Sequence, residues 1–341
     1  MINVEAVLQK LSGETILVTG ATGFTGQTLC RKLASAGAKL VCVARESSDI
    51  SALDDLPITW VRGEVYDEAT LTKAAKGVNY VFHVAAAFNE EKATDEDYRK
   101  VHVYSTQILA KLLLGRKDFK RFLHVSTVGV HGHIEIDRAD ENYRFAPGDG
   151  YQRTKLEGEL WLAEYAAENN FPYAIVRPAP IYGPGDKRLL KFFKMADRGF
   201  TLMLGGGKGM YHLVHVEDLV HVFMLAATVD KAASEIFIAA GDEPISIIEM
   251  GKSIGRAIGK KPRTIRLPIW PFFLAADISK TICTPLGIQP PIYRRRVGFY
   301  TKDRQFDNSK VRNLLDYEFI HDNETGLAET AAWYKEQNLI S

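Results

Sequence analysis

A tyrosine and a lysine stand four positions apart in the segment Tyr151-Gln-Arg-Thr-Lys155. On a helix, this spacing brings both side chains to one face, one turn apart. The pKa of a phenol is about 10, too high for a base at neutral pH, but an adjacent ammonium favours the phenolate and lowers that pKa. We therefore predict that Tyr151 and Lys155 carry out acid–base chemistry at a hydroxyl or carbonyl oxygen.

A hydroxyl that holds the substrate oxygen is the next requirement of this chemistry. Ser126 and Thr127 directly follow an apolar run at residues 121–125, which is typical of a buried strand. Open α/β sheets bind their ligands at the carboxyl ends of such strands. Both hydroxyls are therefore candidates for the third catalytic group.

A glycine-rich turn lies more than a hundred residues upstream, between the apolar run at residues 16–18 and a helical pattern at residues 27–34. Strand, glycine turn and helix open a dinucleotide-binding βαβ unit, in which backbone N–H groups and the helix N-terminus receive the pyrophosphate. Any Cβ at the turn would hold the backbone away from the ligand. The residues predicted to bind the cofactor here are Gly20, Thr22, Gly23, Phe24, Thr25 and Gly26.

These groups require a sheet to position them. The sequence predicts further strands at residues 39–44, 58–62, 80–84, 121–125 and 173–176, and helices at 67–76, 98–114 and 151–168. Apolar strands that alternate with helices predict an α/β fold, a doubly wound parallel sheet covered on both faces.

Beyond residue 177, prolines and glycines interrupt shorter elements. We predict a dinucleotide-binding domain at residues 1–180, with a returning segment at about 213–241. Residues 181–212 and 242–341 would mostly form a smaller, discontinuous substrate lobe.

Bulk properties narrow the function. The chain is 46% hydrophobic and 25% charged, as soluble enzymes are, and its formal net charge of +1 gives no reason to expect nucleic acid as a partner. The three cysteines and nine histidines show no metal-ligand spacing, so we expect no metal and reduced thiols in a cytoplasmic protein.

The first ten residues do not resemble a signal peptide. The most membrane-like stretch, residues 267–276, is too short to span a bilayer; we expect it to pack in the substrate lobe, with a peripheral membrane contact as the alternative.

Together, the glycine turn and the Tyr-x-x-x-Lys helix resemble the extended short-chain dehydrogenase/reductase superfamily, of the NAD-dependent epimerase/dehydratase type, over about residues 14–320. The resemblance implies a Rossmann-type fold. Counting back from Gly132, it also implies that Thr127 is the catalytic hydroxyl, with Ser126 as the second choice. His102 stands where many relatives carry an asparagine that supports a proton relay.

The end of the second predicted strand bears on the choice of nicotinamide cofactor. An acidic residue there binds the ribose of NAD in this fold, but this chain has Ala44 and Arg45, similar to a Val-Arg pair in dihydroflavonol-reductase-like members. A guanidinium pairs with a 2′-phosphate, so we predict NADP in preference to NAD, unless Arg45 only stacks on the adenine. Further cofactor contacts implied by the resemblance are Glu64, Val65, Ala85, Ala86 and Pro178.

The resemblance implies an oxidoreductase that interconverts a ketone and a secondary alcohol, most similar to the dihydroflavonol 4-reductase and 3-beta-hydroxysteroid dehydrogenase branch. Thr127 is not followed by the Asp-Glu pair of the dehydratases, and Tyr211 replaces a pyrophosphate-binding arginine of the epimerases. Two alternatives remain: a nucleotide-sugar epimerase with tightly bound NAD, in which Arg294, Arg295 and Arg296 clamp an anion, and a non-catalytic cofactor-sensing protein. Candidate substrate contacts are Phe88, Ser126, Tyr182, Tyr211 and Arg295.

A homodimer is the predicted assembly. In the superfamily, the Tyr-Lys helix and the helix before the fifth strand pair with their twofold mates. Both helices are apolar over more of their circumference here than one sheet face requires. The alternative is that the small lobe or the N-terminal segment covers them.

Overall fold

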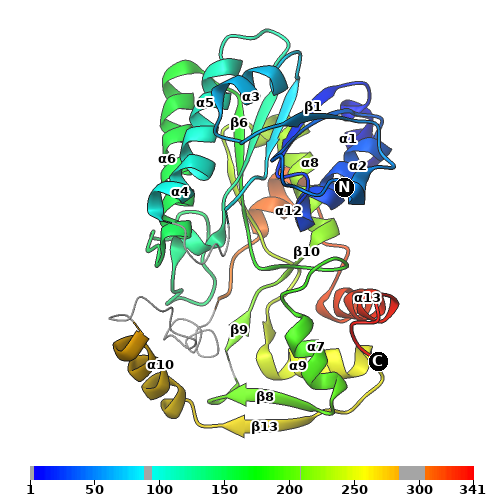
Figure 1. The fold of residues 1–341 in the computed structure, drawn as a ribbon, viewed down its shortest axis with the longest axis vertical. Helices are drawn as coiled ribbons and strands as arrows, with labels where there is room; N and C mark the ends of the chain where they lie inside the picture. Colours follow the sequence, from blue (N-terminus) through cyan, green and yellow to red (C-terminus); the bar gives the residue numbers. More distant parts are fainter. Residues whose placement is uncertain (1–3, 88–93, 208, 284–303) are drawn as a thin grey trace.

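The computed structural model describes residues 4–87, 94–207, 209–283 and 304–341 of the chain. Its centre is one seven-stranded sheet in the order β11-β6-β5-β4-β1-β2-β3, with every pair parallel, as Figure 1 shows. The strands are β1 (Thr15–Thr19), β2 (Lys39–Ala44), β3 (Ile58–Arg62), β4 (Tyr80–His83), β5 (Arg121–Val125), β6 (Tyr173–Pro178) and β11 (Ile236–Ala239). From β1, the chain adds β2 and β3 on one side and then β4, β5 and β6 on the other. This strand order is that of a Rossmann-type sheet and confirms the predicted fold class.

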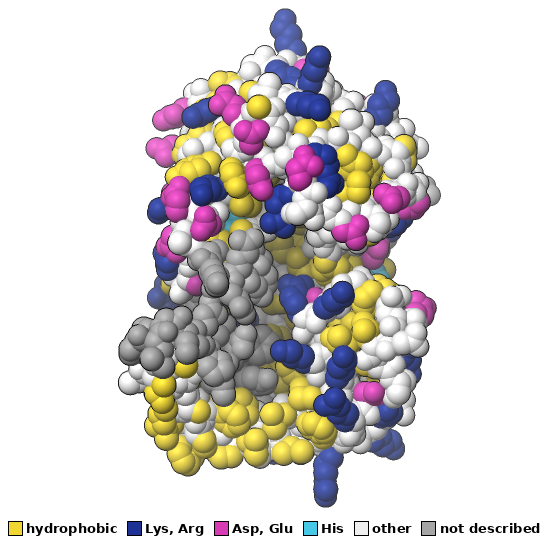
Figure 2. Space-filling model, viewed as in Figure 1, with side chains coloured by type: hydrophobic (Ala, Val, Ile, Leu, Met, Phe, Trp, Pro, Cys, Tyr) yellow, Lys and Arg dark blue, Asp and Glu magenta, His cyan; other side chains and the backbone are white. Residues whose placement is uncertain are grey.

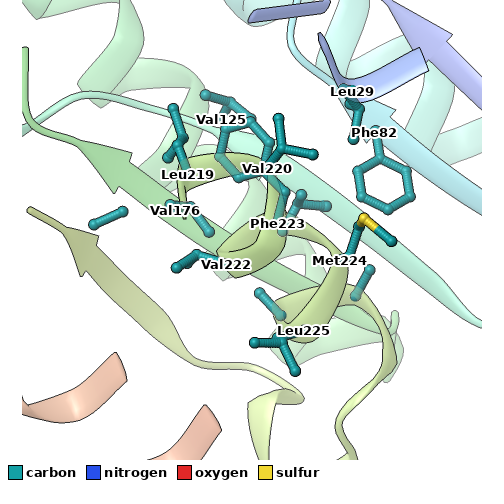
Figure 3. Close-up of a cluster of buried hydrophobic side chains, with 14 of the residues drawn as sticks. Leu29, Phe82, Val125, Val176, Leu219, Val220, Val222, Phe223, Met224 and Leu225 are labelled. Atoms are coloured by element: carbon teal, nitrogen blue, oxygen red, sulfur yellow. The ribbon is translucent and has the colours of Figure 1, made fainter. Parts of the chain in front are cut away.

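Helices cover both faces of the sheet. On one face lie α1 (Val4–Leu11), α2 (Phe24–Ser35), α8 (Val216–Thr228) and α12 (Ser309–Leu315). Figure 3 shows Leu29, Phe82 and Phe223 meeting in the apolar cluster of this face. On the other face, α3 (Glu68–Ala74), α5 (Ser105–Leu113) and α6 (Gly150–Asn169) share a second cluster. Strands covered on both faces explain why β5 and β6 are buried at every position.

The helix predicted at residues 98–114 is interrupted. The structure has α4 (Asp95–Arg99), one π-helical turn at Lys100–Tyr104, and then α5. Two hydroxyls bond the carbonyls of the irregular turn: Ser105 donates to Val101 and Thr106 to His102. Such single π turns occur frequently at functional sites, and this one carries His102.

A smaller lobe lies below the sheet in Figure 1 and has its own apolar core. Its elements are α7 (Leu190–Asp197), β8 (Phe200–Leu204), β9 (Met210–Tyr211), β12 (Ile245–Ser246), α9 (Ile247–Ala257), β13 (Arg263–Leu267), α10 (Trp270–Cys283) and α13 (Asn323–Glu336). Two short strands, β7 (Ile181–Tyr182) and β10 (Val214–His215), pair where the chain passes between the two parts. The surface is hollowed between them in the view of Figure 2.

The chain returns to the main sheet through α8 and β11, and β11 pairs with β6. Both elements lie within the segment that the sequence assigned to the dinucleotide-binding part. Within the described ranges, no helix is both long enough and apolar enough to cross a membrane.

Candidate active site

The glycine turn after β1 has no room for side chains at two of its positions. Gly20 has φ +76°, and a Cβ built on it would lie 2.8 Å from the backbone nitrogen of Ala85. A Cβ on Gly26 would lie 2.0 Å from the carbonyl oxygen of Gly20. Helix α2 begins at Phe24, immediately after the turn. This tight cradle at a helix N-terminus fits the pyrophosphate of a dinucleotide.

A buried histidine supports the loop that faces this cradle. Thr19 Oγ1 accepts a hydrogen bond from the Ala85 N–H (3.2 Å) and donates to His83 Nδ1 (2.8 Å). The other ring nitrogen of His83 donates to Ser105 Oγ (2.9 Å), whose own proton goes to a backbone carbonyl. Burial, and then the nearby charge of Lys155, lower the pKa of His83 to about 3. His83 is therefore a neutral ring that fixes the backbone at Ala85, beside the glycine turn.

Lys155 lies at the carboxyl ends of the central strands. Its side chain is buried, and Nζ donates to the carbonyl oxygens of Val125 (2.9 Å) and Ala85 (3.3 Å). Burial lowers the pKa of Lys155 to about 7. The structure thus brings a predicted catalytic residue and a predicted cofactor-binding residue into direct contact.

Tyr151 stands in the first turn of α6, which Asp149 caps by accepting the backbone N–H of Gln152 at 2.7 Å. Its half-buried ring meets the edges of two aromatic rings, His102 at 5.3 Å and Tyr98 at 6.4 Å between centroids. Burial, and then the charge of Asp149, raise the pKa of Tyr151 to about 12. The phenol is therefore protonated at neutral pH.

His102, the residue in place of the superfamily asparagine, links Tyr151 to the cofactor loop. Its Nε2 accepts the backbone N–H of Ala87 (3.1 Å), and Nδ1 donates to Thr154 Oγ1 (2.8 Å), which donates to the Gly150 carbonyl (2.8 Å). Burial, followed by the charge of Lys155, lowers the pKa of His102 to about 2, so the ring is neutral. Sequence reasoning found the substitution but not these contacts.

The two candidate hydroxyls after β5 differ in their surroundings. Thr127 is partly exposed and caps the short turn at Val128–His131, where its Oγ1 accepts the Gly129 N–H at 3.0 Å. Its hydroxyl proton has no acceptor within the described part of the chain. Ser126 Oγ is buried and has no hydrogen-bond partner among the described residues. Access therefore favours Thr127 over Ser126 as the group that meets a substrate.

The positions predicted to meet the adenosine lie along one edge of the sheet. Arg45 is exposed directly after β2. The neighbouring Arg62 holds the same turn, because its guanidinium donates to the carbonyls of Glu46 (2.7 Å) and Ser48 (3.0 Å). Residues 64 and 65, the predicted Glu-Val pair, are half-buried after β3, which is paired with β2.

The remaining predicted cofactor contacts surround the cradle. The Thr22 carbonyl accepts Gln27 Nε2 at 2.9 Å, and Gly23 is the N-cap of α2. The Phe24 ring lies against Gly185, where a Cβ would come within 3.0 Å of it. Thr25 and Ala86 keep accessible surface, whereas Pro178 is buried at the end of β6.

The predicted substrate contacts are less well supported. Tyr182 is 2% exposed, and its hydroxyl donates to the Asp322 carbonyl at 3.4 Å. Tyr211 is 1% exposed and lies under the Arg304 guanidinium. Both placements favour packing in the smaller lobe over contact with a ligand. Phe88 and Arg295 lie outside the described residues, as do the arginines on either side of Arg295.

A buried ion pair that the sequence did not indicate lies behind the site. Arg177 on β6 and Glu159 on α6 are each 1% exposed, and the Arg177 Nε donates to both carboxylate oxygens at 3.1 Å. The same guanidinium bonds the Glu141 carbonyl (2.8 Å) and His131 Nε2 (3.1 Å). Arg177 thereby joins α6 to the loop that follows Thr127.

A second unpredicted cluster connects the two parts of the chain. His215 Nε2, His321 Nε2 and a Glu329 oxygen lie within 4.8 Å of one another, and the two imidazole rings stack at 3.8 Å. His321 Nδ1 bonds Asp218 at the start of α8 at 2.8 Å. Burial alone would lower the pKa of His321, but the hydrogen bond and charge of Asp218 outweigh it and raise that pKa. The cluster thus ties the segment just before α13, and Glu329 in the middle of that helix, to the start of α8 by ion pairing.

Comparison with known proteins places this geometry in context. Residues 16–240 match the model of the NAD dependent epimerase/dehydratase family. The crystal structure of gox2253 has a TM-score of 0.81 and 24% identity, covering 96% of this chain and 100% of that one, which shows a shared fold.

Two relatives of different named activity are similar over most of their length. The 3beta-hydroxysteroid-dehydrogenase/decarboxylase isoform 1 of Arabidopsis thaliana is 24% identical, over 92% of this chain and 78% of the relative. The UDP-glucose 4-epimerase of Vibrio cholerae is 26% identical, over 75% of this chain and 80% of the relative.

Proposed function

The chain belongs to the NAD-dependent epimerase/dehydratase family and is an NAD(P)-dependent enzyme, and we propose that it interconverts a ketone and a secondary alcohol. The observation that carries the proposal is the position of Lys155. Its ammonium reaches the backbone of Ala85 beside the glycine cradle while it shares a helix face with Tyr151. Lys155 therefore lies between the proposed proton donor, Tyr151, and the proposed cofactor site.

Each residue has a proposed role. Tyr151 donates a proton to the substrate carbonyl oxygen in reduction, and Thr127 donates a hydrogen bond that orients the same oxygen. Lys155 binds the nicotinamide ribose and stabilises the phenolate that Tyr151 leaves behind. The bound nicotinamide supplies the hydride.

The protonation state of Tyr151 bears on direction. A phenol with a pKa of about 12 is in the correct state to donate a proton. To act as a base in the reverse direction it needs a nearby positive charge, from Lys155 or from an oxidised nicotinamide.

We further propose that NADP is preferred. The exposed Arg45 follows β2 where an NAD-binding site would carry a carboxylate, and Arg62 fixes the turn that presents it. A guanidinium there favours a 2′-phosphate.

For the substrate, we propose an apolar, ring-containing ketone. Its support is the similarity to the hydroxysteroid dehydrogenase/decarboxylase and the absence from the sequence of the epimerase-type arginine at position 211. A nucleotide-sugar epimerase is the second candidate, supported by the similarity to the UDP-glucose 4-epimerase.

The first experiment separates these candidates by the cofactor that the purified protein retains. The protein is denatured, and the supernatant is assayed for NAD and NADP. An empty site together with NADPH consumption on a panel of ring ketones supports the reductase. Retained NAD and interconversion of UDP-sugars would support the epimerase, and cofactor binding without any turnover would indicate a sensing protein.

The second experiment tests the proton donor. In Tyr151→Phe, turnover is expected to fall at least about 100-fold, because only the ionisable oxygen is lost, while NADPH affinity is kept. The matched control is Tyr165→Phe on the same helix, whose ring stacks on Trp161 instead of facing the site. Near-normal turnover of Tyr151→Phe, or equal losses in both variants, would remove Tyr151 from the mechanism.

We also propose a homodimer through α5 and α6. The two helices lie side by side on one face of the sheet (Figure 1), and Leu160 of α6 and Tyr104 next to α5 expose large apolar side chains. A twofold contact would bury both.

Two further proposals concern location and lobe boundaries. The free thiols of Cys30 and Cys42, with sulfurs 3.8 Å apart, suit a reducing compartment such as the cytoplasm. The lobe boundaries proposed are those given by the sequence, with residues 1–180 and about 213–241 binding the cofactor.

A further inference from the structure

Helix α10 presents its apolar side chains to solvent. Trp270, Leu274, Ile278 and Ile282 are 67%, 52%, 50% and 56% exposed. They recur every four residues along a helix that runs from Trp270 to Cys283. We name these four residues the α10 stripe.

The α10 stripe occupies one side of the helix. At about 100° per residue, positions four apart advance by roughly 40°, so the four side chains fall within an arc of about 120°. Ala276, the buried residue of α10, lies outside this arc. The charged residues Asp277 and Lys280 also fall outside it. A surface helix normally turns its apolar stripe toward the core, and α10 does the reverse.

Exposed apolar side chains continue beyond the helix. Ile265 on the preceding strand β13 is 41% exposed. In Figure 2, hydrophobic side chains gather along the lower left edge of the molecule, where Figure 1 draws α10 at the outer end of the smaller lobe. Single exposed apolar residues are common on monomers, but a continuous row of them marks an interaction surface.

The charge around the stripe indicates which partner it suits. Residues 261–283 carry four basic side chains and one acidic side chain. The basic residues Lys261, Arg263, Arg266 and Lys280 are all exposed. Long cationic side chains beside an apolar face extend toward lipid headgroups while their stems stay on apolar surface. A protein partner would need a dedicated acidic rim to match this surface, whereas an anionic membrane provides negative charge throughout.

The dimensions fit a helix that lies on a bilayer and does not cross it. The α10 helix has 14 residues, and a span needs about 20. A tryptophan at one end matches the preference of this side chain for the membrane–water interface. We propose that the α10 stripe and the flanking basic residues bind the surface of an anionic lipid bilayer, with the helix lying in the plane of the interface. The proposal does not depend on the reaction that the enzyme catalyses.

The test is co-sedimentation of the full chain with vesicles of phosphatidylcholine, with and without phosphatidylglycerol. The unmodified protein is expected to sediment with the mixed vesicles and much less with the neutral ones. In Leu274→Glu/Ile278→Glu, the partition coefficient is expected to fall about tenfold or more, because two apolar anchors become charged. Both positions are already exposed, so the fold is expected to persist, and the thermal unfolding temperature checks this.

Matched variants separate the apolar contribution from the electrostatic one. Ile136→Glu/Ile320→Glu changes two isoleucines that are at least as exposed as Ile278 but lie outside α10 and β13, and vesicle binding is expected to persist. Arg263→Gln/Arg266→Gln is expected to weaken binding to the mixed vesicles only. A direct probe is Trp270 fluorescence, which brominated lipid should quench; the Trp270→Phe protein should lose that quenching.

Three outcomes would overturn the proposal. The protein could stay in the supernatant with both kinds of vesicle, as it would if residues 284–303 of the same chain covered the stripe. The two glutamate double variants could lose binding equally. Finally, light scattering could show a dimer that Leu274→Glu/Ile278→Glu converts to a monomer without vesicle binding, which would identify a second copy of the chain as the occupant.

Discussion

The buried pair of Glu159 and Arg177 gives the sharpest energetic prediction. Both side chains are 1% exposed, so water screens their charges little. In Glu159→Gln, the guanidinium keeps its bonds to the Glu141 carbonyl and to His131, but it loses its counter-charge. Breaking one side of a buried ion pair costs about 3–5 kcal/mol because the remaining charge is left uncompensated.

This loss is large compared with the total stability of a protein, which is about 5–15 kcal/mol. It should appear as a lower midpoint of urea unfolding, followed by tryptophan fluorescence. The helix supplies its own control: Glu157, two residues earlier, pairs with Arg99 at 2.9 Å, but both side chains are 42% exposed. Glu157→Gln is expected to cost at most about 1 kcal/mol, as exposed pairs do.

The reasoning rests on burial, so the comparison between the two variants is decisive. Equal losses of unfolding free energy in Glu159→Gln and Glu157→Gln would show that burial does not control the strength of these pairs. A loss below about 1 kcal/mol in Glu159→Gln would have the same meaning, because it would show that solvent or the other hydrogen bonds compensate Arg177.

Three further predictions follow from the same structure. Arg45→Ala should weaken NADP binding by about 1.5–3 kcal/mol with little change for NAD, measured by titration calorimetry; equal losses would show that Arg45 only stacks on adenine. Because Asp218 raises the pKa of His321, the stabilisation from their pair is full below the unfolded pKa of about 6.5 and is lost as pH rises through the folded pKa. The stability advantage of the unmodified protein over His321→Gln should therefore shrink as the pH rises above about 6.5, and a constant difference would contradict the ion pair. Trp161→Glu should convert the proposed dimer to a monomer in light scattering, whereas a dimer that survives would place the interface elsewhere.

Strands β1 to β6 of the main sheet could be predicted because the pattern of each lies within its own short segment, whereas for β11 the sequence predicted only a returning segment at about 213–241. Each strand is a short apolar run bounded by glycine or by a helical pattern, and parallel strands buried on both faces require such runs. The glycine turn is equally local, because contacts within one βαβ unit leave no room for a side chain at positions 20 and 26. Tyr151 and Lys155 are four residues apart, so any helix over this segment places them on the same face.

The supporting contacts could not be predicted, because their partners are distant in the chain. From the sequence, His102 is only a histidine in place of an asparagine. The fold adds its two contacts, with Ala87 at one ring nitrogen and Thr154 at the other. The π turn that carries His102 has no sequence pattern that separates it from the continuous helix predicted there. Glu159 resembles any other helical glutamate, and only the position of β6 behind α6 shows that it is buried.

For aromatic residues in the smaller lobe, residue type does not indicate whether a side chain contacts a ligand or packs in the core. Tyr182 is a predicted substrate contact from the proline- and glycine-rich segment after β6, and Tyr211 is one because it replaces an epimerase arginine; the structure buries both side chains. The Tyr182 hydroxyl occupies the space that a side chain at Gly326 of α13 would need, and its ring meets the edge of His215. A buried tyrosine stabilises a core wherever it packs, so residue type alone does not separate packing from recognition. Exposure separates the two possibilities here, because Thr127 keeps accessible surface whereas these two rings do not.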